Sequence, residues 1–130
     1  MMKIGRFEDL EIWQEARELS KMIFKLTDVE PFCSDYKLKN QIKSSTGSIM
    51  DNIAEGFERG GNNEFKQFLS IAKGSCGETR SQAYRAFDYE YISEDEFNEL
   101  HERSVILSKK IASFMTYLNK SHYQGTKYKP

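Results

Sequence analysis

Residues 48–75, SIMDNIAEGFERGGNNEFKQFLSIAKGS, decide the fold of this chain. The stretch ends one helical pattern at Gly60-Gly61 and begins another at Asn62-Asn63, so only a short turn separates two helices. The second pattern repeats apolar residues every three or four positions from Phe65 to Ala86. A repeat of this period predicts a helix that buries one face against its neighbours.

Three further stretches carry the same spacing, and strict alternation of the kind found in strands fits none of them. The spacing predicts helices over residues 8–28, 35–58, 63–90 and 94–120. Because the connections are short, we expect an all-α, antiparallel up-down-up-down four-helix bundle that occupies residues 1–130 as one domain. Residues 121–130, SHYQGTKYKP, lose the periodicity, and we expect a mobile polar tail there.

The residues between the patterns carry helix-end signals. Pro31 breaks the chain after the first helix, and Ser34 is the expected N-cap of the second. Asn62 is expected to cap the third helix. Ser93 and Glu96 have the spacing of a capping box, in which each side chain bonds to the other residue's backbone amide.

Composition narrows the function classes. The net charge is −1 with 30% charged residues, so no overall field draws the protein to nucleic acid or to a membrane. Cys33 and Cys76 are too few for a disulfide framework. No apolar run approaches the roughly 20 residues of a membrane span, and no signal peptide is recognisable. We therefore expect a cytoplasmic protein without a membrane partner.

The residue pattern offers no catalytic or metal centre. A di-iron bundle needs two Glu-x-x-His units, but Asn98 and Asn119 stand three positions before His101 and His122. Two cysteines and two distant histidines do not supply the three or four ligands of a zinc site. No glycine-rich loop carries the lysine and serine of a phosphate cradle. We expect neither an enzyme nor a bound cofactor.

A basic ridge follows the third predicted helix. Lys66, Lys73 and Arg80 recur every seven residues, and Arg59 keeps that spacing before the glycine break. Further lysines on the neighbouring helix could widen the ridge: Lys37, Lys39 and Lys43. The ridge either contacts phosphates of RNA or DNA or is an ordinary solvated face, because several carboxylates lie nearby: Glu55, Glu58, Glu64 and Glu78.

A second stripe on the same helix consists of small residues: Ser70, Gly74, Gly77 and Ser81. Glycines inside a helix cost roughly 1 kcal/mol each relative to alanine, so we expect another backbone to approach closely there. That backbone belongs either to the same bundle or to another subunit. Trp13, Phe57 and Phe68 lie off the main core positions. They either join a contact between subunits or fill a wide core.

Three blocks of sequence carry a family resemblance: FEDLEIWQEARELSKMIFKLT (7–27), QIKSSTGSIMDNIAEGF (41–57) and NEFKQFLSIAKGSCGE (63–78). Over about residues 6–120 the chain resembles the four-helix-bundle family of the 23S rRNA intervening-sequence proteins. This family also includes the accessory variability determinant protein of diversity-generating retroelements. The resemblance implies a homopentamer without enzymatic activity. In the retroelement branch it implies that a basic surface binds nucleic acid and a reverse transcriptase.

The chain departs from the strongly basic retroelement proteins through its acidic fourth helix, which carries Glu94, Asp95, Glu96, Glu99 and Glu102. Five copies would still bring five basic ridges into one ring. Asn52, Glu55 and Gly56 match the family's central motif, and we interpret Asn52 and Glu55 as hydrogen-bonding partners across helices, with catalysis as the alternative. The leading hypothesis is a non-catalytic homo-oligomer that contacts RNA or DNA. The alternative is a structural or protein-interaction bundle.

Overall fold

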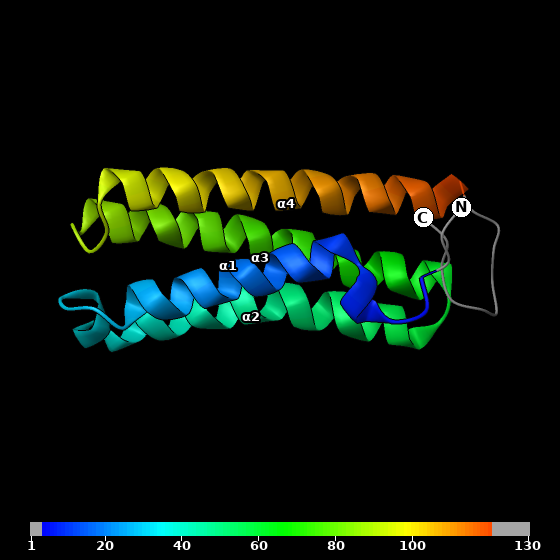
Figure 1. The fold of residues 1–130 in the computed structure, drawn as a ribbon, viewed down its shortest axis with the longest axis horizontal. Helices are drawn as coiled ribbons and strands as arrows, with labels where there is room; N and C mark the ends of the chain where they lie inside the picture. Colours follow the sequence, from blue (N-terminus) through cyan, green and yellow to red (C-terminus); the bar gives the residue numbers. More distant parts are fainter. Residues whose placement is uncertain (1–3, 121–130) are drawn as a thin grey trace.

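A computed structural model describes residues 4–120, which contain four α-helices, two short 3-10 turns and no strand (Figure 1). The helices are α1 (Glu11–Thr27), α2 (Tyr36–Arg59), α3 (Asn62–Asp88) and α4 (Glu94–Lys120), and the turns are η1 (Phe7–Asp9) and η2 (Phe32–Ser34). The all-α prediction is confirmed. The first helix begins later than predicted because η1 forms a separate turn ahead of it. The predicted tail, 121–130, lies outside the described residues.

Helices that follow one another in the sequence pack side by side. The connection between α2 and α3 lies at the end of the bundle where α1 begins and α4 ends, and the other two connections lie at the opposite end (Figure 1). Gly60 makes the tight turn between α2 and α3 with a φ of 87°, which a residue without a β-carbon adopts most readily. Asn62 Nδ2 donates to Leu118 O at 3.2 Å and so ties the start of α3 to the end of α4.

The core follows the apolar repeat along the whole bundle. Ile23, Ile42, Leu69 and Ile111, one from each helix, are fully buried. Several buried hydroxyls donate to carbonyl groups of their own helix, as when Ser104 Oγ donates to Leu100 O at 2.7 Å. No helix in the described part of the chain combines the length and the apolarity needed to cross a membrane.

The predicted caps hold in one case out of three. Asp35, not Ser34, caps α2, and its Oδ1 accepts from Leu38 N at 3.0 Å. Gly61 is the N-cap of α3, because Asn62 already belongs to the helix and points inward. The capping box of α4 is confirmed: Glu96 N donates to Ser93 Oγ at 3.1 Å, and Ser93 N donates to Glu96 Oε1 at 2.8 Å.

Candidate nucleic-acid and subunit surfaces

Three of the four predicted basic residues line the edge of α3 that faces α4. Lys66 Nζ donates to Asn119 Oδ1 on α4 at 2.7 Å, which fixes the direction of this edge. Lys73 is exposed and Arg80 is half-buried. Within residues 4–120, neither of these two cations has a carboxylate at ion-pair distance. We call Lys66, Lys73 and Arg80 the α3 basic edge.

Arg59 does not belong to this edge, because it lies at the end of α2 and its charge is compensated. Its guanidinium pairs with Glu55 at 2.9 Å and with Glu64 at 3.6 Å, and it lies 5.1 Å from the centre of the Phe68 ring. The hydrogen bond from Arg59 to Glu55 raises the pKa of the guanidinium above its usual value. Lys43, which was expected to widen the ridge, instead lies over the ring of Phe24 on α1 at 5.3 Å.

The small-residue stripe of α3 faces outward. Ser70 and Gly74 are exposed and Gly77 is half-buried. A β-carbon added at Gly74 or Gly77 would meet nothing within 4 Å. The described chain therefore contains no segment that approaches these glycines closely. Of the two alternatives for a close approach to these glycines, only the backbone of a second subunit is left.

The close approach between helices occurs at Gly56 instead. A β-carbon built at Gly56 would lie 2.6 Å from Phe68 Cβ and 2.9 Å from Phe65 Cδ1. Such distances are shorter than real contacts allow, so only glycine fits at position 56. This requirement explains the glycine of the Asn52-Glu55-Gly56 motif as a packing feature of α2 against α3.

The three aromatic residues that were candidates for a subunit interface differ in position. The interface alternative is wrong for Phe57, which is 0% exposed and packs edge-to-face on Phe65 with ring centres 6.0 Å apart. Phe68 is half-buried between α2 and α3. Trp13 is half-buried beside Phe7, with ring centres 5.1 Å apart. Phe57 is therefore core, because the interior of a four-helix bundle is wider than two heptad positions.

Asn52 and Glu55 do not form a joint site. Asn52 Nδ2 donates to Ser48 O at 2.8 Å and to Ser48 Oγ at 2.9 Å, both within α2. Glu55 is exposed and pairs with Arg59. The expected bond across helices is made by Ser48, whose Oγ accepts from Ser75 Oγ at 3.0 Å. The pair thus supplies no shared acid–base arrangement.

A polar seam that sequence reasoning missed continues this contact along α2 and α3. Ser45 Oγ donates to Gln82 Oε1 at 2.7 Å and lies 2.8 Å from Thr79 Oγ1. All three residues are buried. The available signal was the presence of Ser45 and Thr79 at core positions of the heptad repeat. Fully bonded buried polar groups of this kind favour one register between two helices.

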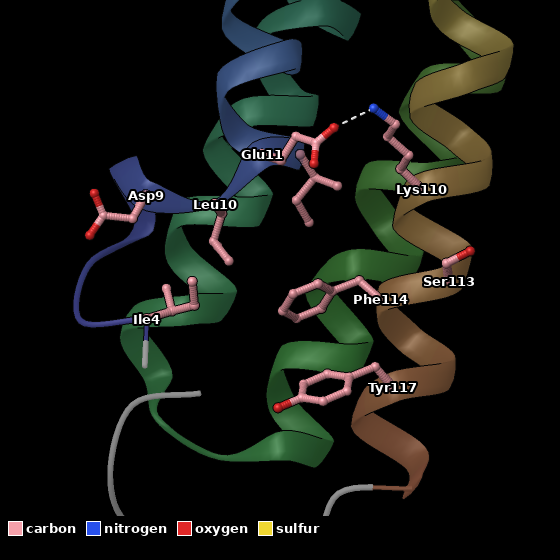
Figure 2. Close-up of a pocket in the computed structure, with 9 residues that line it drawn as sticks. Ile4, Asp9, Leu10, Glu11, Lys110, Ser113, Phe114 and Tyr117 are labelled. Carbon is pink, nitrogen blue, oxygen red and sulfur yellow. Dashed lines mark hydrogen bonds and ion pairs between the residues drawn. The ribbon is translucent and has the colours of Figure 1, made fainter. Parts of the chain in front are cut away.

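An apolar cavity of about 470 Å³ opens at the end of the bundle between α1 and α4 (Figure 2). Ile4, Leu10, Phe114 and Tyr117 line it. At its rim Lys110 bonds to Glu11 and pairs with Glu15 at 2.9 Å, and the bond to Glu11 raises the pKa of Lys110. The sequence patterns did not reveal this cavity because two of its lining residues, Ile4 and Leu10, precede α1 and belong to no periodic pattern.

Two reactive possibilities are limited by the geometry. Among residues 4–120, no three His, Cys, Asp or Glu side chains lie close enough to hold a metal ion together. Cys76 is fully buried in α3, and burial raises the pKa of its thiol to about 12. A thiol with that pKa carries almost no thiolate at neutral pH and is therefore a packing residue.

These features define an all-α bundle of four helices with an inner polar seam, a glycine-rich outer face and surface cations. The family model of the 23S rRNA-intervening sequence proteins matches residues 8–113, and the chain belongs to this family. The relation to the retroelement proteins stays a prediction.

One solved structure supports the fold independently. It is the crystal structure of a protein of unknown function from the S23 ribosomal protein family of Bacteroides thetaiotaomicron, with a TM-score of 0.73 and 22% identity. The match covers 80% of this chain and 97% of that chain. At this identity the likeness concerns the fold alone. No protein with a curated description matches the sequence significantly.

Proposed function

We propose that this protein is a non-catalytic homo-oligomeric bundle that associates with RNA or DNA through the α3 basic edge. The observation that carries the proposal is the state of Lys73 and Arg80. They lie about 10 Å apart along one helix at 1.5 Å per residue, and no described carboxylate neutralises either charge. Unpaired cations along one helix edge can contact phosphates of a backbone without reading its sequence.

Assembly provides the affinity that one chain lacks. A single copy has a net charge of −1 and offers a short basic edge. A ring of copies repeats that edge, and binding at several edges at once raises the overall affinity without new contacts in each subunit. The family resemblance implies five copies in this ring. Through the retroelement branch it adds a reverse transcriptase as a candidate partner.

The proposed subunit contact lies on the outer stripe of α3: Ser70, Gly74 and Gly77. The support for this placement is energetic, because the two glycines weaken α3 by roughly 1 kcal/mol each and gain no contact within the described chain. A helix of a second copy could approach them to near backbone distance. Ile71, which is 52% exposed, borders the stripe and would become buried by the same contact.

The second candidate is a structural or protein-interaction bundle without nucleic-acid affinity. The observation that favours it is the acidic start of α4, where Glu94, Asp95 and Glu96 are all exposed and would repel phosphates near that end of the bundle. This function requires the α3 stripe but not the α3 basic edge. The two candidates therefore differ in what happens when the cations are reversed.

The test is a titration of labelled duplex RNA at about 50 mM and about 200 mM salt. We expect the affinity of the wild type to fall steeply with salt because phosphate contacts release counterions. The Lys73→Glu/Arg80→Glu variant should bind much more weakly, whereas a control with two reversed cations elsewhere, Lys25→Glu/Lys120→Glu, should change affinity little. Binding that ignores salt, or equal losses in both variants, would contradict the proposed edge.

A further inference from the structure

The surface between α1 and α2 carries aromatic rings and cations in contact with one another. Trp13, Arg17 and Phe24 are spaced i, i+4 and i+11 on α1, and Tyr36 and Lys43 are spaced i, i+7 on α2. The guanidinium of Arg17 lies 5.8 Å from the centre of the Trp13 ring, and Lys43 Nζ lies 5.3 Å from the centre of the Phe24 ring. We call these five residues the α1–α2 face.

The rings of this face are unusually open to solvent. Tyr36 is 71% exposed and Phe24 is 59% exposed. Trp13 is half-buried, so its indole is held against Phe7 while part of it faces outward. Exposed aromatic area on this scale gains free energy when a flat partner covers it.

The cations of the face are not neutralised. Within residues 4–120, neither Arg17 nor Lys43 has a carboxylate at ion-pair distance. The remaining cation–ring contact of the described chain differs, because Arg59 over Phe68 is also paired with two carboxylates. Glu18, exposed on α1 next to Arg17, pairs with Lys21 at 3.4 Å instead of with Arg17. Asp28, just after α1, and Asp51 on α2 are also exposed, and neither is paired with a cation of the face.

We propose that the α1–α2 face binds a single-stranded nucleic acid by stacking unpaired bases on its rings while Arg17 and Lys43 contact the phosphates. Trp13 and Phe24 are about 16 Å apart along α1 at 1.5 Å per residue, so two separate bases can be covered. A guanidinium plane such as that of Arg17 also serves as a stacking surface. Alternating rings and cations are typical of sites that hold single strands without sequence preference.

This site is distinct from the α3 basic edge. α1 packs against α2 and α4, whereas α3 lies diagonally across the bundle from it. The α3 basic edge offers cations for any phosphate backbone, whereas the α1–α2 face requires bases that are free to stack. The choice of nucleic acid as ligand rests on the proposed function, and the preference for single strands rests on the rings.

The test compares an oligouridylate of about 12 nucleotides with a duplex RNA of the same length. Trp13 is the single tryptophan of the chain, so its fluorescence reports directly on this face. We expect the single strand to quench Trp13 and to bind more tightly than the duplex. Phe24→Ala should weaken single-strand binding at least about fivefold, the lower end of the cost of losing one base–ring stack. Lys43→Glu should weaken it as well.

Controls separate this proposal from the general function. Lys73→Glu/Arg80→Glu should reduce duplex binding and leave the Trp13 quenching by single strands in place. Unchanged single-strand affinity in Phe24→Ala and Lys43→Glu would overturn the proposal, and the α3 basic edge would still stand if its own variants lost binding. A lower oligomer mass in Phe24→Ala would also overturn it, because the face would then be a subunit contact.

Discussion

The backbone of Gly56 lies so close to Phe68 that a β-carbon at position 56 would stand 2.6 Å from Phe68 Cβ. This contact sets how closely α2 and α3 approach one another at their turn. We expect Gly56→Ala to destabilise the protein by about 1–3 kcal/mol, because a methyl group is forced into a filled space. Urea unfolding followed by circular dichroism measures the change.

The matched control lies in the same helix. A β-carbon added at Gly47 meets nothing within 4 Å, so Gly47→Ala should stabilise by about 0.4–1 kcal/mol through helix propensity and a less flexible unfolded chain. Equal effects of the two substitutions would show that the approach of α3 to Gly56 is not tight.

The buried polar seam gives a second prediction. Ser45→Ala removes the hydroxyl that Gln82 Oε1 accepts from, and it leaves Thr79 without one of its neighbours. Leaving a buried acceptor unsatisfied costs about 1–3 kcal/mol, so the unfolding free energy should fall by that amount. Ser44→Ala on the exposed side of α2 should stay within about 0.5 kcal/mol of the wild type. An unchanged unfolding free energy in Ser45→Ala would mean that water or a rearranged side chain donates to Gln82 Oε1 instead.

The cap of α2 predicts a dependence of stability on pH. The pKa of Asp35 is lowered, first because its carboxylate accepts from the Leu38 amide and second because it accepts from Tyr91 Oη at 2.9 Å. A lowered folded-state pKa means that the stabilisation is present above the unfolded value of about 3.9 and is lost as pH falls through the folded value. The hydrogen bond between Tyr91 Oη and the Asp35 carboxylate also raises the pKa of the Tyr91 hydroxyl.

We therefore expect the wild type to lose more stability than Asp35→Asn between about pH 5 and about pH 2.5, because asparagine still caps the helix but does not titrate. Urea midpoints at the two pH values measure this difference. Parallel losses in the two proteins would show that Asp35 titrates alike in the folded and unfolded states.

The sequence was sufficient for the helices but not for the surfaces. Heptad spacing depends on burial, which dominates stability, so the core face of each helix follows from the residues alone. The position of Arg59 could not be predicted from its seven-residue spacing to Lys66. That spacing places two residues on one face only within a continuous helix, and the helix ends before Gly60. Heptad spacing left Phe57 open between a subunit contact and the core because it does not define how wide the core is, and the structure buries Phe57 completely. The cavity next to Ile4 depends on tertiary contacts of a segment without periodicity.

The open glycines of α3 tie the assembly to the fold. Gly74→Leu places a large side chain where the described chain leaves free space, so a single bundle should accommodate it and gain helix propensity. A second copy packed at backbone distance could not accommodate it. Gly74→Leu should therefore weaken assembly and leave the fold of one bundle intact. Circular dichroism checks that the helix content is unchanged.

Light scattering of the wild type and Gly74→Leu is the most direct test of the central claim, that copies of this bundle assemble through the outer stripe of α3. We predict a wild-type mass that is a multiple of the 15.2 kDa chain, and a lower mass for a fully helical Gly74→Leu. A wild type of 15.2 kDa, or a Gly74→Leu oligomer of unchanged mass and stability, would contradict the account.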